Sequence, residues 1–160
     1  TVPEKLVACV LKRPRHEKII NSLNSLGVKI DFITDGDVSG VISVAYENTD
    51  IDIYIGVGGA PEGVLAAAAL ECLGCQMQTR LVFEGEEQKN RAKKLGIKDL
   101  RMKYNISDMI KGDVIFCATG VTDGNLVEGI KDLGSKFQAE TFALHKSSGI
   151  NKKIKKIIKK

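Results

Sequence analysis

The sequence has no long hydrophobic run, and it opens with no signal-peptide pattern. No apolar stretch approaches the roughly 20 residues that a membrane-spanning helix needs. No basic start, apolar core and small-residue cleavage site precede the first strand-like segment. We therefore expect a cytoplasmic protein without a membrane partner. With 43% hydrophobic and 28% charged residues, the chain of 160 residues is long enough for one domain with a buried core.

An initiating methionine is also missing. The first residue is Thr1, and strand-like sequence begins at Lys5-Leu6-Val7. We therefore expect that the chain is part of a longer one or a processed product.

Acidic residues are absent from the last ten positions, 151–160, which hold six lysines. The formal net charge of +4 comes from this segment, so the body of the chain lacks the basic face that a nucleic-acid-binding protein carries. Ile150, Ile154, Ile157 and Ile158 recur at helical spacing. This pattern predicts that 150–160 is a Lys-rich amphipathic tail, a terminal helix with a solvated lysine face. The alternative is a membrane-surface or partner-binding segment.

Cysteine and histidine are scarce, and their spacing argues against a metal site. Cys72 and Cys75 form one C-x-x-C, but no second pair stands nearby to complete a structural zinc site. The pair closes a predicted helix around Gly74, whereas a thioredoxin-like pair opens one. Such reduced thiols fit an intracellular protein. His16 has no second histidine within helical reach, so we interpret it as a structural or solvent-facing residue.

A glycine-rich turn is the feature around which the rest of the sequence is organised. An apolar strand at 51–55 leads into Gly56–Gly63, and an alanine-rich helix continues through 64–70. We expect the glycines to allow positive φ and close approach of a ligand. Pro61 suits the first helical turn, and the carboxylate of Glu62 would lie there beside free N–H groups. A capped helix is one interpretation, and a metal or phosphate site is the other.

Two further polar turns follow predicted strands. Strand 5–12 ends in Lys12-Arg13-Pro14-Arg15-His16, where Pro14 suits a helix start and guanidinium groups match phosphate oxygens. Strand 28–33 ends in Thr34-Asp35-Gly36-Asp37, before a helix over 38–46. Arg13 and Arg15 are either phosphate ligands or a solvated charge cluster. Asp35 and Asp37 either accept hydrogen bonds from ligand hydroxyls or cap the helix.

The remaining sequence continues the alternation of strands and helices. Further strands are predicted at 76–83, 114–118 and 137–144, the last at an edge or half-exposed. Helices are predicted at 84–95 and within 99–110, the latter capped by Ser107 and Asp108. The turn 119–124, with Thr119 and Thr122, is interpreted as structural rather than ligand-binding. The pattern predicts an α/β fold, a layered sheet of mostly parallel strands with flanking helices.

In such a sheet the three polar turns lie at one edge, where ligands bind. Cations, carboxylates and free N–H groups together suit a phosphorylated, hydroxyl-rich small molecule. A dinucleotide cofactor is disfavoured, because Pro61 takes the sixth position of the required G-x-G-x-x-G.

The sequence resembles the class II fructose-1,6-bisphosphatases over nearly its whole length, from Val7 to about Ile157. The shared motifs are Arg13-Pro14-Arg15-His16, Asp35-Gly36-Asp37, Gly58-Gly59-Ala60-Pro61-Glu62-Gly63 and Ala118-Thr119-Gly120-Val121-Thr122. The resemblance is to the C-terminal half of these enzymes. It implies that 1–160 is a single α/β domain, the C-terminal lobe of the inositol-monophosphatase-like sugar phosphatase fold.

This resemblance implies a function and a set of site residues. The family hydrolyses the 1-phosphate of fructose 1,6-bisphosphate with Mg²⁺ or Mn²⁺ in gluconeogenesis, and some members also accept sedoheptulose 1,7-bisphosphate. Glu62 would be a metal ligand. The substrate contacts would be Arg13, Pro14, Arg15, Asp35, Gly36, Asp37 and Gly59. The implied partners are a sugar bisphosphate, an N-terminal lobe and further copies in a homo-oligomer, but not nucleic acid.

Three features depart from the family pattern. Arg13 stands where the family usually has lysine, and the Cys72–Cys75 pair has no counterpart role. The sequence also contains no Asp-Pro, whereas the main metal-binding acids of the family follow an Asp-Pro-x-x-Gly-Thr motif in the N-terminal half. We therefore expect no catalytic residue and no phosphatase activity in this chain alone. The alternative is a non-catalytic module that binds a sugar phosphate or has a regulatory role.

Overall fold

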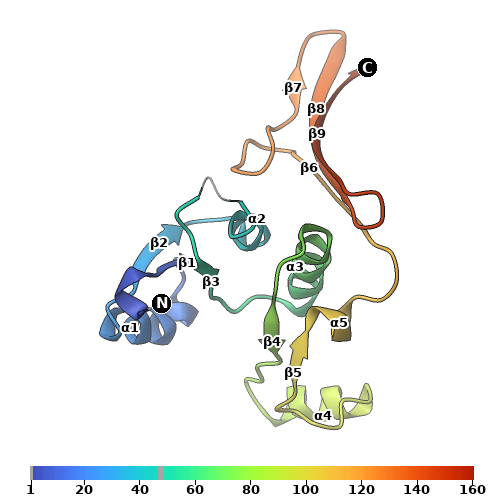
Figure 1. The fold of residues 1–160 in the computed structure, drawn as a ribbon. Coiled ribbons are helices and arrows are strands. Elements are labelled where there is room, and N and C mark those ends of the chain that lie inside the picture. Colours follow the sequence, from blue (N-terminus) through green and yellow to red (C-terminus); the bar gives the residue numbers. More distant parts are fainter. Residues whose placement is uncertain (1, 47–48) are drawn as a thin grey trace.

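The computed structural model describes residues 2–46 and 49–160 and consists of three sheets around two central helices (Figure 1). The helices are the short 3₁₀ segments η1 (Pro3–Lys5) and η2 (Pro14–His16), then α1 (Glu17–Ser25), α2 (Asp37–Ser43), α3 (Ala60–Leu73), α4 (Glu86–Lys94) and α5 (Ile106–Met109). The strands are β1 (Val7–Leu11), β2 (Lys29–Ile33), β3 (Ile53–Tyr54), β4 (Gln78–Arg80), β5 (Lys103–Asn105), β6 (Ile115–Thr119), β7 (Lys131–Asp132), β8 (Lys136–His145) and β9 (Ile150–Lys159).

The first sheet is parallel and has the order β2-β1-β3. Its central strand β1 is the continuous apolar run of the sequence, and four of its five residues are buried. Helix α1 covers this sheet through a core that includes Val10, Leu23 and Val28. This part of the chain confirms the predicted strand–helix alternation, because a strand buried on both faces reads as an unbroken apolar segment.

The other two sheets are antiparallel, so the prediction of one mostly parallel sheet is wrong. The strand predicted at 76–83 is only Gln78–Arg80, and it pairs with β5 in a separate two-stranded sheet. The third sheet contains β6, β7, β8 and β9. The fold class is α/β, but parallel pairing is confined to the first sheet among the described residues.

Strand β8 is central rather than an edge. It pairs with β6 and β7 and also, over its whole length, with β9. Its alternate residues Glu140, Phe142 and Leu144 are buried, which explains the mixed polar and apolar sequence of the segment.

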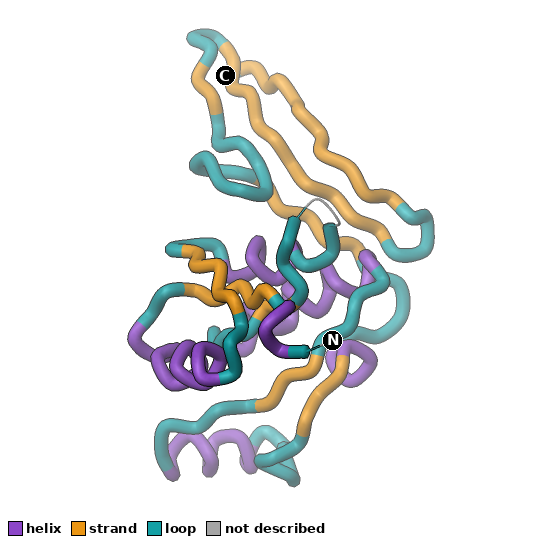
Figure 2. Tube along the Cα trace, turned by 60° about the vertical axis from the view of Figure 1, so that its left-hand side comes forward, coloured by secondary structure: helices purple, strands orange, loops and turns teal. Residues whose placement is uncertain are grey.

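The lysine-rich tail is a strand, and the expected terminal helix is absent. β9 continues from β8 through a tight turn and forms an outer edge of the third sheet (Figure 2). All ten of its residues are exposed. Lysines on an edge strand hinder its pairing with the strands of other chains. This explains why a strand at this position is rich in lysine.

Helices α2 and α3 join the first and third sheets. Ile42 of α2 and Ala69 of α3 pack with Phe116, Phe142 and Leu144 of the third sheet. The alanines of α3 have a clear role here, since small side chains let a helix approach its neighbours closely on several sides. None of the described helices combines the length and the apolar character that crossing a membrane requires.

Candidate active site

The three polar turns emerge at one edge of the first sheet, as the sequence predicts. Strands β1, β2 and β3 run parallel, so their carboxyl ends point the same way. The turn after β1 contains Arg13, Pro14 and Arg15, and it packs directly on the glycine turn after β3. Arg15 Nε donates a hydrogen bond of 2.6 Å to the carbonyl oxygen of Val57.

The two arginines have different surroundings. Arg13 has extended backbone before the 3₁₀ turn that begins at Pro14, and its guanidinium donates to the adjacent Lys12 carbonyl at 3.1 Å. Arg15 is anchored to the glycine turn through Nε. Both side chains are exposed at the sheet edge, where guanidinium groups can meet an anion.

His16 is completely buried, which confirms the structural role expected for it. Its ring bridges the end of β1 and the glycine turn. Nδ1 lies 2.6 Å from the carbonyl oxygen of Leu11, and Nε2 lies 2.8 Å from the amide nitrogen of Val57.

The Asp-Gly-Asp turn holds its carboxylates through neighbouring backbone groups. Asp35 Oδ1 accepts from the Gly36 N–H at 2.8 Å, and Asp37 Oδ1 accepts from the Val38 N–H at 2.9 Å. Gly36 is the N-cap of α2 and adopts φ 74°, a left-handed conformation that favours glycine. Neither aspartate is the N-cap, and no side chain makes a capping hydrogen bond to α2, so the interpretation of these two residues as helix caps is wrong.

Asp37 points toward the glycine turn. A Cβ atom built on Gly58 would lie 3.2 Å from Asp37 Oδ2, so the second oxygen of this carboxylate faces the turn after β3. The arginine, aspartate and glycine turns are therefore brought together by tertiary structure, although 19 residues (16–34) separate the first from the second and 18 residues (38–55) separate the second from the third.

The glycines of this turn allow neighbouring side chains to approach the backbone closely, and they do not adopt a left-handed conformation. Gly56, Gly58, Gly59 and Gly63 are not among the residues with positive φ, so that part of the sequence prediction is wrong. A Cβ at Gly59 would lie 2.2 Å from Glu62 Oε2. The carboxylate thus folds back over Gly59, the N-cap of α3. Pro61 and Glu62 occupy the first turn of that helix as predicted.

Tyr54 is a residue at this edge that the sequence analysis missed. Its hydroxyl would lie 3.0 Å from a Cβ at Gly56. Burial, reinforced by the Asp37 carboxylate and, in alkali, by the Cys9 thiolate, raises the pKa of Tyr54 to about 12, although the Arg15 guanidinium opposes the shift. The hydroxyl therefore remains a proton donor at neutral pH. The available signal was its position as the last residue of a strand before a glycine turn.

Other predicted candidates lie away from this edge. Thr119 shares a hydrogen bond of 2.8 Å with Thr141 in the third sheet, and Asp123 Oδ1 accepts from the Gly129 N–H at 2.8 Å. These contacts agree with the interpretation of 119–124 as a structural turn. A cavity of about 570 Å³ between α2 and the third sheet is lined by Ser43, Tyr46 and Asn151 among others, and by none of the predicted site residues.

The two cysteines of the C-x-x-C pair lie at the C-terminal end of α3. Cys72 and Cys75 are free thiols at the end of α3, where Gly74 caps the helix in a left-handed conformation. Burial raises the pKa of both thiols, so both are protonated at neutral pH and are weak nucleophiles. Cys72 Sγ contacts the carbonyl oxygen of Val114 at 3.6 Å.

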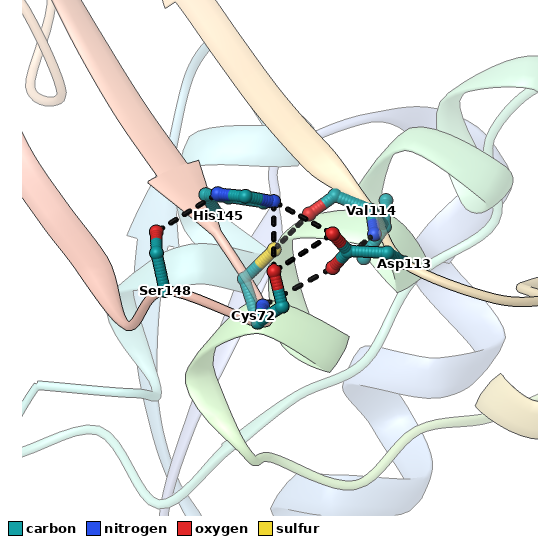
Figure 3. Close-up of polar contacts among 6 residues, drawn as sticks. Cys72, Asp113, Val114, His145 and Ser148 are labelled. Atoms are coloured by element: carbon teal, nitrogen blue, oxygen red, sulfur yellow. Dashed lines mark hydrogen bonds and ion pairs between the residues drawn. The ribbon is translucent and has the colours of Figure 1, made fainter.

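A second polar cluster adjoins Cys72 and lies outside the predicted site (Figure 3). Asp113 Oδ2 is 2.8 Å from His145 Nε2 and accepts from the Ser147 hydroxyl at 2.8 Å. Ser148 Oγ lies 2.8 Å from His145 Nδ1. These bonds hold the pKa of Asp113 at about 2, with the Ser147 hydroxyl as the largest cause. The cluster ties the β8–β9 turn to the start of β6.

The acidic groups that the structure describes can be compared with the ligand set that a metal ion requires. Across residues 2–46 and 49–160, no group of three or more histidines, cysteines, aspartates and glutamates is placed to hold a metal ion. The carboxylates at the sheet edge, those of Glu62 and Asp37, are hard oxygen donors of the kind that Mg²⁺ and Mn²⁺ prefer.

A comparison with known proteins identifies a family and several relatives. The model of the family described as "Bacterial fructose-1,6-bisphosphatase, glpX-encoded" matches residues 1–158. Two relatives carry the name D-fructose 1,6-bisphosphatase class 2/sedoheptulose 1,7-bisphosphatase. The protein from Synechococcus sp. (strain JA-3-3Ab) is 35% identical over 156 residues, which is 89% of this chain and 45% of that protein.

The protein from Synechocystis sp. (strain ATCC 27184 / PCC 6803 / Kazusa) is 38% identical over 141 residues, which is 80% of this chain and 41% of that protein. The chain thus spans less than half the length of the curated relatives that it matches. Because the family match runs through all three turns and the third sheet, the chain belongs to the glpX-encoded bacterial fructose-1,6-bisphosphatases, the class II enzymes.

Proposed function

We propose that this chain is the C-terminal lobe of a class II fructose-1,6-bisphosphatase. The complete protein would hydrolyse the 1-phosphate of fructose 1,6-bisphosphate, and sedoheptulose 1,7-bisphosphate would be a second substrate. The observation that carries this proposal is the gathering of Arg15, Asp37 and Glu62 by three parallel strands, with Arg15 bonded to the glycine turn and Asp37 facing it. The names of the relatives support the reaction.

The substrate would be held by the turns after β1 and β2. The guanidinium groups of Arg13 and Arg15 bind phosphate oxygens, and Pro14 fixes the backbone between them. Asp35, Gly36 and Asp37 accept hydrogen bonds from sugar hydroxyls, with Asp37 already facing the glycine turn. Gly59 leaves room for the substrate and for the carboxylate beside it.

Glu62 would be this chain's metal ligand. Its carboxylate lies in the first turn of α3, where unpaired N–H groups and the helix dipole favour negative charge. A bound Mg²⁺ or Mn²⁺ supplies a water of lowered pKa and screens the charge on the leaving oxygen. The other ligands would come from the N-terminal lobe, so this chain alone would be inactive. We place the complete enzyme in the cytoplasm, in gluconeogenesis, as a homo-oligomer.

Phosphate release from fructose 1,6-bisphosphate tests this function. In the complete protein with Mg²⁺ or Mn²⁺, we expect Glu62→Gln to lower kcat by about 100-fold. The matched control is Glu87→Gln, also in the first turn of a helix but on α4, and it should leave kcat unchanged.

Two results would overturn parts of the proposal. Normal hydrolysis by the 160-residue chain alone would show that no second lobe is needed. Binding of the sugar bisphosphate by a complete protein that never releases phosphate would favour the non-catalytic module instead.

A further inference from the structure

His16 connects two of the three turns that form the candidate site, and nothing in its own side chain is exposed. Nδ1 lies 2.6 Å from the carbonyl oxygen of Leu11. Nε2 lies 2.8 Å from the amide nitrogen of Val57 and 3.0 Å from the carbonyl oxygen of the same residue. The imidazole thus spans from the end of β1 to the middle of the glycine turn.

These partners define the tautomer of the ring. The carbonyl of Leu11 can only accept, so Nδ1 must carry the proton. The Val57 N–H can only donate, and its contact with Nε2 at 2.8 Å is shorter than the 3.0 Å contact of Nε2 with the Val57 carbonyl oxygen, so we assign the lone pair to Nε2. In this assignment His16 donates to the end of β1 and accepts from the glycine turn.

Val57 is held at both of its backbone polar atoms. Its N–H donates to His16, and its carbonyl accepts from Arg15 Nε at 2.6 Å. Val57 is flanked by Gly56 and Gly58. Glycine segments have large conformational freedom, and the neighbouring glycines lie against the carboxylates of Asp37 and Glu62. A restraint on Val57 therefore sets where these carboxylates meet the backbone.

We propose that His16 is a positioning residue, which locks the glycine turn onto the Arg13–Arg15 turn through Val57. The lock fixes the spacing between the phosphate-binding guanidinium of Arg15 and the metal-binding carboxylate of Glu62. This inference rests on the proposed function for its effect on catalysis, but the lock itself is a property of this chain.

Two variants separate the lock from simple loss of the ring. In His16→Gln the side-chain amide oxygen reaches the place of Nε2, so it can accept from Val57, whereas the bond to Leu11 is lost. In His16→Asn the amide nitrogen takes the place of Nδ1, so the bond to Leu11 is kept and the bond to Val57 is lost. His16→Asn also removes one methylene more than His16→Gln, so the comparison rests on protection of the Val57 amide itself and not on overall stability.

We expect His16→Gln to keep the Val57 amide protected from hydrogen exchange and His16→Asn to lose that protection. In the complete enzyme, His16→Asn should lower kcat for fructose 1,6-bisphosphate by about 100-fold, since small displacements of catalytic groups have effects of that size. His16→Gln should retain most of the activity. Equal protection of Val57 and equal kcat in the two variants would overturn the proposal.

The ring of His16 provides a test that needs no variant at position 16 and no measurement of activity. It contains only two histidines, His16 and His145, so ¹⁵N spectra of the imidazoles can be assigned by mutating His145. We expect Nδ1 of His16 to be protonated and Nε2 to be unprotonated. A protonated Nε2 would rule out the lock. If the lock is present and the complete protein releases no phosphate, the proposed function fails and the positioning role in the turn stands.

Discussion

At the scale of single residues, the site depends on glycines, whose lack of a side chain leaves room for neighbouring polar atoms. Tyr54, Asp37 and Glu62 each place an oxygen close to a glycine, at Gly56, Gly58 and Gly59 respectively. All three glycines have backbone conformations open to other residues. Their role is therefore the space that they leave for neighbouring polar atoms, which is a tertiary requirement.

Gly59→Ala should disable the site without unfolding the chain. The new methyl group would lie 2.2 Å from Glu62 Oε2, so the carboxylate must move, whereas φ −67° and ψ 150° suit alanine. We expect a large loss of metal-dependent phosphate release with little change in the melting temperature, measured by calorimetry.

Gly63→Ala is the matched control for this change. No atom lies within 4 Å of the added Cβ, and alanine raises stability in a helix by up to about 1 kcal/mol. The site assignment of Glu62 would be contradicted if both alanine variants had the same activity.

At the scale of elements, the helix α2 shows how closely the first sheet is packed. Gly40 is buried within α2, and a Cβ there would lie 2.6 Å from Ile33 Cδ1 and 3.0 Å from Tyr54 Cε2. The helix therefore lies on the sheet with no room for a methyl group. This contact also helps to hold Tyr54 at the site edge.

Gly40→Ala should destabilise the protein although alanine favours helices. Overpacking of a buried site typically lowers the free energy of unfolding by about 1–3 kcal/mol, which exceeds the propensity gain. Urea unfolding of this variant beside Gly63→Ala measures the difference. A Gly40→Ala protein as stable as the parent would show that α2 shifts freely on the sheet.

The β8–β9 hairpin should loosen in acid through Asp113. The hydroxyl of Ser147 and the ring of His145 hold the pKa of Asp113 at about 2, below its ordinary value of 3.8. A lowered acid pKa means that the ionised group stabilises the fold above about pH 4 and that this contribution is lost as the pH falls toward 2. The carboxyl ¹³C shift should titrate near pH 2.

Two hydroxyl variants make this measurement specific. Ser147→Ala removes the largest cause of the lowered pKa, so the midpoint should rise toward 3.8. Ser148→Ala removes only a bond to His145 Nδ1 and should move the midpoint less. The reverse order would contradict the hydrogen-bond assignment.

At the scale of the whole molecule, one core joins the third sheet to the helices behind the site. Phe142 of β8 is 2% exposed, and its ring meets that of Phe116 edge to face with centroids 6.4 Å apart. Ile42 and Ala69 complete the contact from α2 and α3. The position of the third sheet therefore depends on a few large side chains.

Phe142→Ala should lower the free energy of unfolding by about 3–5 kcal/mol, the usual cost of removing a buried phenylalanine. Phe137 of the same strand provides the control, because it is 36% exposed and Phe137→Ala should have a much smaller effect. Similar losses for both would mean that the third sheet is not packed on α2 and α3 as described.

Local sequence determined the first sheet and its turns. The buried run of β1, the positions of Pro61 and Glu62 in the first turn of α3, and the end of that helix at Gly74 all follow from residue type and short-range spacing. Such features depend on neighbours within a few positions, so a sequence pattern can predict them. The meeting of the three turns at one edge was expected from the parallel pairing of their strands, but that pairing itself joins segments distant in sequence.

Only the tertiary structure determined the conformation of the lysine-rich segment, the antiparallel sheets and the contacts of Gly59 and His16. Isoleucines at 150, 154, 157 and 158 fit a helix, but pairing along all of β8 makes the segment a strand, because sheet partners outweigh local spacing. The antiparallel sheets, the space requirement at Gly59 and the hydrogen bonds of His16 to Leu11 and Val57 likewise join residues distant in sequence. Long-range contacts of this kind leave no local pattern from which they can be predicted.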